Sequence, residues 1–345
     1  MKDIEIRKKE HLDLALDERS GDTGSFSTTP CGNGLDAVHL PYDALFEVSD
    51  SELDTSTQMA CFPLAFPWMI GAMTGGVSFA SPINTAFRAL AKDFGIAICL
   101  GSMRAALEDE TAIFTYGLGG GEAVFANIGW AEIERFRPEN VSRICDKMGA
   151  NGIFIHLNVL QEWMQPGGER QLSVRFKALK DFIDAMDRPV FLKEVGSGIG
   201  GKCAQRLCEL AIAGIETAGR GGTSWIKLEA LRRQPPLDDG FVASLAQLGY
   251  RTGDILPRLR RDLGDRTLIA SGGIHTPIDL IKSLALGADL AATAQPIYRV
   301  YAQSGRDGLA TWMAQFIEVA KLIWRSTGAK NLYALKNINT AESST

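Results

Sequence analysis

The segment NGIFIHLNVLQE at residues 151–162 decides the fold. It opens with the apolar run IFI, which is typical of a strand buried on both faces. It then ends in four polar residues: His156, Asn158, Gln161 and Glu162. An α/β barrel builds its catalytic rim from buried strands that end in such groups. A strand leading into an ordinary capped helix would give the same local pattern, so the rest of the chain has to decide.

Further apolar segments repeat this pattern, and each ends in glycine or polar residues. The expected strands are 67–73, 96–100, 123–127, 152–158, 189–195, 214–218, 267–270 and 288–293, with helical stretches between them. This succession of strand–loop–helix units fits a (β/α)8 TIM barrel. A doubly wound sheet would favour GxGxxG after the first strand, where the chain has MTGG. We therefore predict an α/β fold with one (β/α)8 barrel at residues 63–334.

The predicted barrel is flanked by an N-terminal extension, 1–62, and a flexible tail, 335–345. Residues 1–20 are predicted to form a charged amphipathic helix, 21–34 a loop rich in Gly, Ser and Thr, and 35–62 an irregular stretch. The helix carries the basic cluster RKK at 7–9. Such a cluster is either a solvated face or a clamp for a phosphate dianion.

Composition excludes several classes of protein. Apolar residues make up 46% of the 345 and charged residues 22%, enough for a large core. A net charge of −5 argues against a general nucleic-acid binder. The six cysteines form no CxxC pair, and we expect Cys99 and Cys145 to be reduced core thiols of a cytoplasmic protein. Neither a signal peptide nor a membrane span is expected, because the N-terminus is charged and long apolar runs are absent.

The loops after the seventh and eighth strands indicate a phosphate site. In this fold these loops commonly bind phosphate through backbone N–H groups and a helix N-terminus. Ser271–Ile274 and Ala294-Gln295 supply the small residues that close backbone approach requires. We therefore expect a ligand that carries phosphate.

Lys193 lies inside an apolar strand, where an unpaired charge is costly. We expect it to face the barrel mouth and meet an anion or an electron-rich ring, rather than pair with Glu194 or another carboxylate. Thr74, Ser102 and Asn127 end three further strands and suit the edge of a flat polar heterocycle. Together with the phosphate loops they indicate FMN, since a nicotinamide dinucleotide would need a second phosphate site.

The motifs that carry a family resemblance are RKKEH (7–11), AMTGG (72–76), GSMRAAL (101–107), HLNVLQE (156–162), QPGGER (165–170), KEVGSGI (193–199), GRGGTSW (219–225) and ASGGI (270–274). With them the chain resembles the type 2 isopentenyl-diphosphate isomerases, FMN-dependent barrel enzymes that require Mg²⁺. The motifs occur in the family's order and, with the loop ending at Gln295, span most of the chain.

The resemblance implies a role for each matching residue. FMN contacts are expected from Ala72, Met73, Thr74, Ser102, Asn127, Lys193 and Thr223, and contacts to its phosphate from Gly272, Gly273, Ile274, Ala294 and Gln295. Substrate contacts are expected from Arg7, Lys8, His11, Arg104, Asn158 and Gln161. Gln161, Lys193 and His156 would be catalytic, and Glu162 would bind Mg²⁺.

The implied reaction interconverts isopentenyl diphosphate and dimethylallyl diphosphate. Reduced FMN would act as acid and base without net redox, and NADPH would serve only to reduce it. Lys193 would stabilise the reduced anionic flavin, and Gln161 would orient the alkene. The family is usually a homotetramer or homo-octamer. The chain departs from the usual pattern at Met103, often Gln, at Ala218, often Ser, and at Gln295, often Gly. The usual WGIPT stretch appears here as GYRT at 249–252.

Three other interpretations are weighed against this one. An FMN-dependent 2-hydroxy-acid oxidase needs a His base and an Arg pair, and GRGGTSW offers Arg220 but no His, while His275 follows the phosphate loop. A dehydrogenase with Cys203 as nucleophile conflicts with the helical pattern around that residue. A non-catalytic FMN-binding barrel would leave Gln161, Glu162 and the basic N-terminus without a role.

Overall fold

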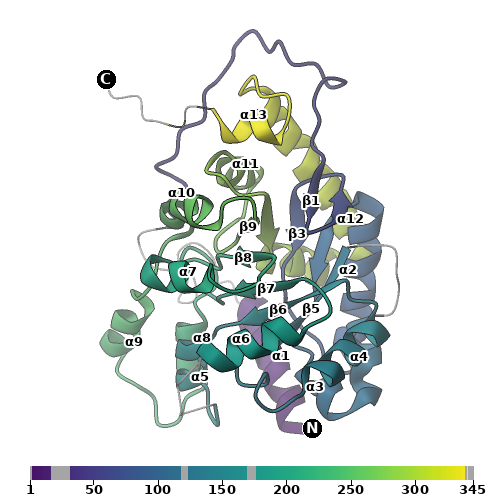
Figure 1. The fold of residues 1–345 in the computed structure, drawn as a ribbon, viewed down its shortest axis with the longest axis vertical. Coiled ribbons are helices and arrows are strands. Elements are labelled where there is room, and N and C mark those ends of the chain that lie inside the picture. The colour runs from purple at the N-terminus through teal and green to yellow at the C-terminus, as the bar shows by residue number, and fades with distance from the viewer. Residues whose placement is uncertain (1, 17–31, 118–122, 169–175, 339, 341–345) are drawn as a thin grey trace.

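A closed barrel of parallel strands forms the centre of the molecule, as predicted. The computed structural model describes residues 2–16, 32–117, 123–168, 176–338 and 340. Its strands follow one another around the barrel in chain order, and β10 closes it against β3 (Figure 1). They are β3 (Trp68–Ile70), β4 (Ala97–Cys99), β5 (Ala123–Gly129), β6 (Gly152–His156), β7 (Val190–Lys193), β8 (Gly214–Glu216), β9 (Thr267–Ala270) and β10 (Leu290–Thr293).

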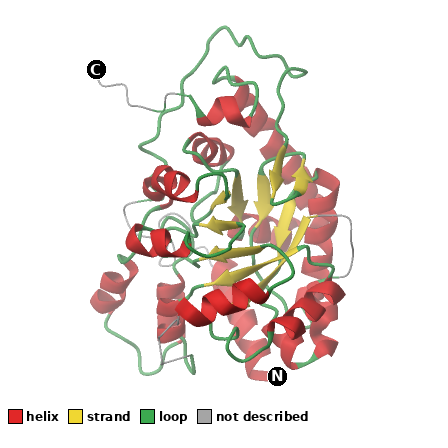
Figure 2. Ribbon diagram, viewed as in Figure 1, coloured by secondary structure: helices red, strands yellow, loops and turns green. Residues whose placement is uncertain are grey.

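Helices surround the strands (Figure 2). Most of these helices are amphipathic and bury their apolar face against the outer side of the barrel. They are α1 (Lys2–Leu16), α2 (Ala80–Phe94), α3 (Arg104–Glu108), the 3₁₀ helix Glu110–Tyr116, α4 (Pro138–Met148), α5 (Val159–Met164), α6 (Phe176–Ala185), α7 (Gly201–Leu207), α8 (Trp225–Arg232), α9 (Asp239–Ala246), α10 (Thr252–Leu263), α11 (Pro277–Ala285), α12 (Gln295–Arg325) and α13 (Leu332–Lys336).

The barrel interior is apolar toward the N-terminal ends of the strands. Phe154 and Phe191 stack with their centroids 5.0 Å apart, and Phe125 meets Phe191 edge-on at 5.5 Å. All three rings are fully buried. Because side chains alternate along a strand, the residues two positions further on also point inward. That next level holds Asn127, His156 and Lys193, so the polar groups stand on a floor of aromatic rings.

A short hairpin closes the opposite, N-terminal end of the barrel. Its strands, β1 (Thr57–Met59) and β2 (Phe62–Leu64), pair antiparallel. Met59 and Leu64 are buried in the cluster that fills the barrel. Residues 35–62 were expected to be irregular, so this hairpin is a correction. Each of its strands is only three residues long, too short for a periodic pattern.

The C-terminal segment is ordered further than expected. Residues 335 and 336, assigned to the tail from sequence, belong to α13. Leu335 is fully buried, and Lys336 pairs with Asp289 at the base of β10. Burial of this one leucine anchors the helix, because an apolar side chain of its size contributes about 2 kcal/mol. Residues 341–345 lie outside the described part of the chain.

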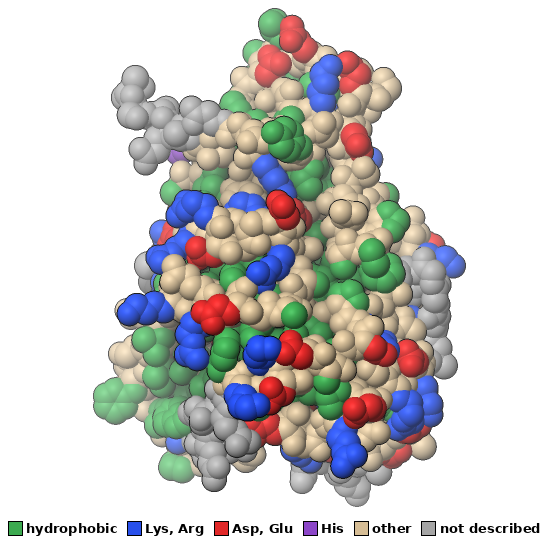
Figure 3. Space-filling view, viewed as in Figure 1, with side chains coloured by type: hydrophobic (Ala, Val, Ile, Leu, Met, Phe, Trp, Pro, Cys, Tyr) green, Lys and Arg blue, Asp and Glu red, His purple; other side chains and the backbone are tan. Residues whose placement is uncertain are grey.

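The surface carries both positive and negative side chains. On the face drawn in Figure 3, acidic and basic side chains alternate over most of the molecule, and apolar side chains gather over α9. Within the described residues, none of the helices has the length and apolar character that crossing a bilayer requires. Cys99 and Cys145 are buried free thiols, which confirms that part of the prediction.

Candidate functional site

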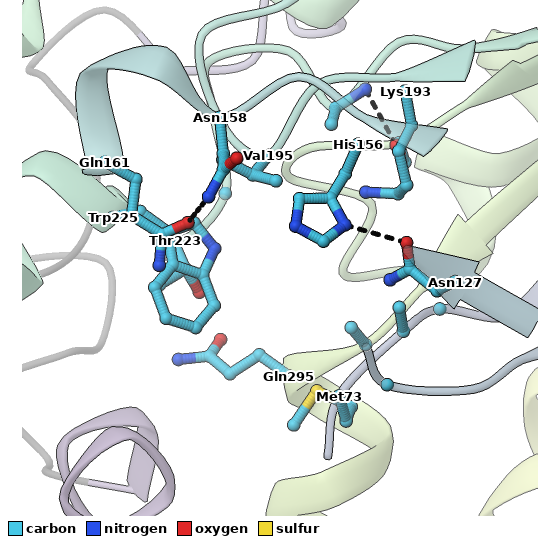
Figure 4. Close-up of a pocket in the computed structure, with 18 of the residues that line it drawn as sticks. Met73, Asn127, His156, Asn158, Gln161, Lys193, Val195, Thr223, Trp225 and Gln295 are labelled. Carbon is cyan, nitrogen blue, oxygen red and sulfur yellow. Dashed lines mark hydrogen bonds between the residues drawn. The ribbon is translucent and has the colours of Figure 1, made fainter. Parts of the chain in front are cut away.

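A cavity of about 290 Å³ opens at the C-terminal mouth of the barrel. Every residue predicted for the site lines it, although those residues come from α1, α5 and the ends of many strands (Figure 4). They are Arg7, Lys8, His11, Ala72, Met73, Thr74, Ser102, Arg104, Asn127, His156, Asn158, Gln161, Glu162, Lys193, Thr223, Gly272, Gly273, Ile274, Ala294 and Gln295. The sequence therefore predicted which residues meet; their individual roles stay predictions.

The loop after β9 forms a backbone cradle. Gly272 and Gly273 have φ angles of +97° and +80°, and a Cβ added to either would lie within 2.4 Å of a carbonyl oxygen of the loop after β8. Asn33 Nδ2 donates to the Gly273 carbonyl at 2.6 Å. Within the described residues no protein acceptor meets the N–H groups of Gly272 or Gly273. Such unpaired N–H groups bind an anion well.

The N-terminus of α12 adjoins this cradle. Ala294 is its N-cap and Gln295 its first residue, and both line the cavity. α12 is interrupted by a kink at Gly305, and its first segment carries a partial positive charge at its N-terminus, which favours a phosphate there. The cradle and this helix end therefore fit the phosphate of FMN.

The polar level above the aromatic floor is built by strand register. His156, Lys193 and Glu216 are partners on adjacent strands, so their side chains lie side by side inside the barrel. Lys193 Nζ donates to the Glu194 carbonyl at 2.8 Å and lies 3.5 Å from Glu216 Oε1. The expectation that Lys193 would lack a carboxylate partner was wrong. Sequence reasoning considered the neighbour in the chain, whereas the partner stands on the next strand.

His156 is held as a neutral ring. Its Nδ1 lies 2.9 Å from Asn127 Oδ1, and because an amide oxygen only accepts, we assign the proton to Nδ1 (Figure 4). Burial, reinforced by the ammonium of Lys193, lowers the pKa of His156 to about 3. Its Nε2 is then an acceptor at neutral pH.

The rim formed by β3 and β4 offers polar atoms without protein partners. Thr74 Oγ1 is buried and has no hydrogen-bond partner within the described residues. Asn84 Nδ2 fixes the Thr74 carbonyl at 3.1 Å, and Tyr116 donates to the Ser102 carbonyl at 2.6 Å. An orphaned buried hydroxyl is costly unless a ligand meets it. This edge therefore fits the polar rim of a flavin ring.

The N-terminal helix α1 crosses the barrel mouth. Lys8 Nζ donates to the Gly75 carbonyl at the end of β3, and His11 Nε2 lies 3.1 Å from Glu229 Oε1 on α8. Arg232 links the two helices further by donating to Glu10 at 2.8 Å. These contacts bring Arg7, Lys8 and His11 to the cavity wall.

Arg104 adds a third cation to the same part of the cavity. Its guanidinium lies 3.0 Å from Glu108 and 3.4 Å from Glu132. Burial, followed by the positive charges of Arg7 and Arg104, lowers the pKa of Lys8 to about 8. Cations that lower the pKa of a neighbouring lysine repel it, and this repulsion is offset when an anion binds between them.

The helix α5 presents amide and carboxylate groups as the sequence predicted. Asn158 Nδ2 donates to Gln161 Oε1 and to Glu162 Oε1, each at 3.1 Å. Gln161 Nε2 in turn donates to Glu229 Oε1 at 3.2 Å. The amide of Gln161 therefore has its orientation fixed from both sides.

Glu162 suits a metal ion that takes most of its coordinating atoms from a bound substrate and from water. No group of three or more His, Cys, Asp or Glu side chains in the described part of the chain could enclose a metal ion. Mg²⁺ usually takes one or two protein carboxylates and completes its shell with phosphate oxygens and water. The single carboxylate of Glu162 beside the cations fits such an ion and not a closed metal site.

The comparisons with known proteins decide the family. A family model described as FMN-dependent dehydrogenase matches residues 160–340. A relative from Mycolicibacterium vanbaalenii named isopentenyl-diphosphate delta-isomerase is 36% identical over 98% of this chain and 97% of its own length. One of the same name from Bacillus licheniformis is 36% identical over 96% and 91%. The chain belongs to the type 2 isopentenyl-diphosphate delta-isomerase family.

Solved structures agree on the architecture of this isomerase family member. A mandelate oxidase mutant with (S)-mandelic acid aligns with a TM-score of 0.68 over 99% of this chain and 98% of its own, at 16% identity. Mandelate oxidase with (S)-2-phenylpropionate gives a TM-score of 0.67 at 18% identity, over 97% of this chain and 96% of its own. At this identity the likeness shows the fold alone.

The residues that an oxidase or a dehydrogenase would use either lie outside the cavity or already contact another group of the protein. Arg220 Nη1 donates to the Gln247 carbonyl at 2.8 Å, and Arg220 does not line the cavity. His275 does line it, but its Nε2 lies 3.4 Å from the Gly221 carbonyl. Cys203 is on α7 and outside the cavity, as its helical pattern predicted.

The departures from the usual isomerase residues have different consequences. Met103 is fully buried and does not line the cavity, so its side chain cannot contact a ligand there. Ala218 has a φ of +39°, rare for a residue with a Cβ, and its N–H donates to Ser271 Oγ at 2.8 Å. Ser271 thus places a hydroxyl next to the position where Ala218 lacks one. Gln295 remains at the helix end beside the cradle.

Sequence reasoning missed acidic residues that complete the site. Glu132, Glu216 and Glu229 all line or support the cavity and are buried. Burial raises the pKa of Glu132. The available signal was a carboxylate within a segment that carries no other charge, as in AIAGIETA at 211–218. Trp225, also missed, meets His11 edge-on with centroids 5.2 Å apart.

Proposed function

We infer that this protein interconverts isopentenyl diphosphate and dimethylallyl diphosphate, using bound FMN and Mg²⁺. Family membership supports the reaction. The observation that carries it in the structure is a single cavity with two anion sites: the glycine cradle beside α12 and the cations Arg7, Lys8 and Arg104. One site suits the monophosphate of the cofactor, and the other suits a diphosphate substrate.

The chain would hold FMN by its phosphate and by the polar rim of its ring. When bound and reduced, FMN supplies the acid and the base for the transfer of one proton to an alkene carbon and another from its neighbour. The cradle of Gly272 and Gly273 would hold the phosphate, and Thr74, Ser102 and Asn127 would meet the ring's edge. Lys193 would place positive charge near the ring, where negative charge needs stabilising.

The diphosphate would be held between α1 and α3. Arg7 and Arg104 offer guanidinium groups suited to bidentate contact with phosphate oxygens, and Lys8 adds an ammonium. Glu162 would supply a carboxylate oxygen to Mg²⁺, which would offset part of the negative charge of the diphosphate, with His11 close by. These contacts would fix the charged end and leave the hydrocarbon end to enter the barrel mouth.

The hydrocarbon end would lie against Gln161, Asn158 and His156. Gln161 is oriented by its bonds to Asn158 and Glu229, so it can position the alkene without its own amide rotating. The neutral His156 adds no competing positive charge. A cavity closed by substrate excludes water, which strengthens each electrostatic contact inside it.

We further propose that NADPH supplies the electrons that reduce the bound FMN, and that the protein works in the cytoplasm as a homotetramer or homo-octamer. Residues 1–62 would act as an extension that completes the substrate site, and residues 63–334 as the barrel that binds FMN. The contacts of α1 with Gly75 and Glu229 support that role for the extension.

The test is conversion of isopentenyl diphosphate by the purified full chain with FMN, Mg²⁺ and dithionite under argon. We expect dimethylallyl diphosphate to form only when reduced FMN and metal are both present. Product formed equally without FMN would contradict the proposal. Oxidation of 2-hydroxy acids without any isomerisation would support the oxidase instead.

A further inference from the structure

Glu216 is a buried carboxylate to which neither the sequence nor the family resemblance gave a role. It ends β8, in register with Lys193 on β7, and its side chain is only 4% exposed. Its Oε1 lies 3.5 Å from Lys193 Nζ, and its Oε2 has no hydrogen-bond partner within the described residues. Both residues line the cavity.

Hydrogen bonds made by Ser271 fix the position of this carboxylate. Ser271 Oγ donates to Glu216 Oε1 at 2.8 Å and accepts the N–H of Ala218 at 2.8 Å. The N–H of Ser271 donates to Thr217 Oγ1 at 2.8 Å. The carboxylate cannot rotate away from Lys193 without losing its bond from Ser271 Oγ, and that hydroxyl is itself held by the Ala218 N–H.

The Lys193–Glu216 pair changes the electrostatic field at a ligand bound above it. A lone ammonium in an apolar barrel presents a full positive charge, whereas an ammonium beside a fixed carboxylate presents a dipole whose field declines faster with distance. A cofactor that must both give and take a proton works best when its proton affinity is matched to the reaction rather than driven to one extreme.

We propose that Glu216 is a positioning residue that holds the Lys193 ammonium under the FMN ring and moderates its charge. Its carboxylate thereby limits how strongly the site favours the reduced, anionic form of the ring over the oxidised form. This inference rests on the proposed function, because it takes FMN as the ligand of the cavity. It predicts a property of bound FMN that can be measured without substrate.

The experiment measures the midpoint potential of bound FMN in the full-length holoprotein and in Glu216→Gln. Glutamine keeps the size of the side chain and can still accept from Ser271, but it lacks the charge. We expect a potential higher by about 30 mV or more, which corresponds to a tenfold gain in affinity for reduced over oxidised FMN. An unchanged or lower potential would overturn the proposal.

Action through Lys193 is tested in a second background. Without the Lys193 ammonium, Glu216 has no positive charge to position or to moderate. Glu216→Gln should therefore shift the potential much less in Lys193→Met protein than in the unsubstituted protein. Equal shifts in both backgrounds would show that Glu216 acts independently of Lys193 and would contradict the proposal.

Two further variants make the test specific. Glu216→Asp keeps the charge but withdraws it by one methylene, so we expect a smaller rise; it also carries the test if the Gln variant does not fold. Glu132→Gln is the matched control, because that buried carboxylate lines the same cavity but pairs with Arg104. If Glu132→Gln shifts the midpoint potential as much as Glu216→Gln does, the effect is a general result of removing negative charge. That outcome would contradict the proposal.

The outcomes separate this inference from the proposed function. A protein that isomerises its substrate but shows no shift in Glu216→Gln contradicts only the role of Glu216. A protein that shows the shift but makes no dimethylallyl diphosphate contradicts only the reaction.

Discussion

Lys8 is the residue whose charge depends most directly on pH in the working range. Its pKa of about 8, lowered by burial and by Arg7 and Arg104, means that the ammonium loses its proton above pH 8 in the substrate-free protein. We expect KM for isopentenyl diphosphate to rise up to about tenfold per pH unit above 8, with kcat changing less, because the diphosphate binds best to the charged form. The measurement is KM across pH 6.5–9.5.

Lys8→Gln should raise KM at pH 7 and flatten its dependence above pH 8. Lys9→Gln is the matched control, because the neighbouring lysine is exposed and does not line the cavity. A steep dependence that survives in Lys8→Gln would assign the ionisation to another group.

His156 should affect stability in acid rather than catalysis at neutral pH. Its folded-state pKa of about 3 lies below the usual value of 6.5, because burial and Lys193 disfavour the cation. The unfolded chain therefore binds the extra proton between pH 6.5 and pH 3, so stability is complete above pH 6.5 and falls with pH in that window. The loss is about 1.4 kcal/mol per pH unit.

His156→Gln should reduce this slope when unfolding in urea is followed at pH 4.5, 5.5 and 6.5. The profile of kcat/KM should show no break near pH 6.5 that disappears in the variant. A break that does disappear would mean that His156 carries a proton in the reaction.

Glu162 is expected to determine the metal dependence. If its carboxylate binds Mg²⁺, Glu162→Gln should raise the Mg²⁺ concentration needed for half-maximal activity at least tenfold, because an amide is a weaker ligand for a hard cation. The measurement is activity across a Mg²⁺ titration after chelation. FMN binding should stay unchanged, which separates metal loss from misfolding. Unaltered metal dependence would refute the assignment.

At the level of elements, the loop after β9 depends on its glycines. Gly272→Ala would place a Cβ 2.0 Å from the Gly219 carbonyl at a φ of +97°, so the cradle must deform. We expect FMN affinity to fall at least tenfold and stability to fall by about 1–3 kcal/mol. Flavin fluorescence titration and thermal unfolding provide the two readouts.

Gly264→Ala is the control for this prediction. Gly264 also has a positive φ, +59°, but nothing lies within 4 Å of an added Cβ, and it follows α10 away from the cavity. Its φ of +59° with ψ of −123° is also disfavoured for a residue with a Cβ, so Gly264→Ala should lose about 1–3 kcal/mol of stability and keep its FMN affinity. Equal FMN affinities for the two alanine variants would contradict the role of the cradle.

A strand or helix could be predicted where its own residues form a clear local pattern. The apolar run at 153–155 and the polar residues after it identified β6 and α5, because a buried strand must be apolar. The limits of strands were less accurate: 67–73 was expected, whereas β3 is Trp68–Ile70. Beyond Ile70 the chain leaves the ladder to form the cavity wall, and some residues that line the cavity, such as Ala72, look apolar in sequence.

At the scale of the whole molecule, the order of the units predicted the closed barrel, and its closure brings the strand ends together. That closure explains why residues as distant as Arg7 and Gln295 line one cavity. The sequence could not reveal the partners Lys193–Glu216 or Gln161–Glu229, because each joins two elements through tertiary packing. Local patterns identify a residue's strand but not the side chain that faces it.

The central claim is that FMN acts as acid and base without being consumed. The most direct test reduces the holoprotein once with dithionite, removes the excess reductant, and adds isopentenyl diphosphate and Mg²⁺ without oxygen. We predict many equivalents of dimethylallyl diphosphate per FMN, with the flavin spectrum still that of the reduced form at the end. At most one equivalent of product per reduced FMN, with the flavin left oxidised, would contradict it.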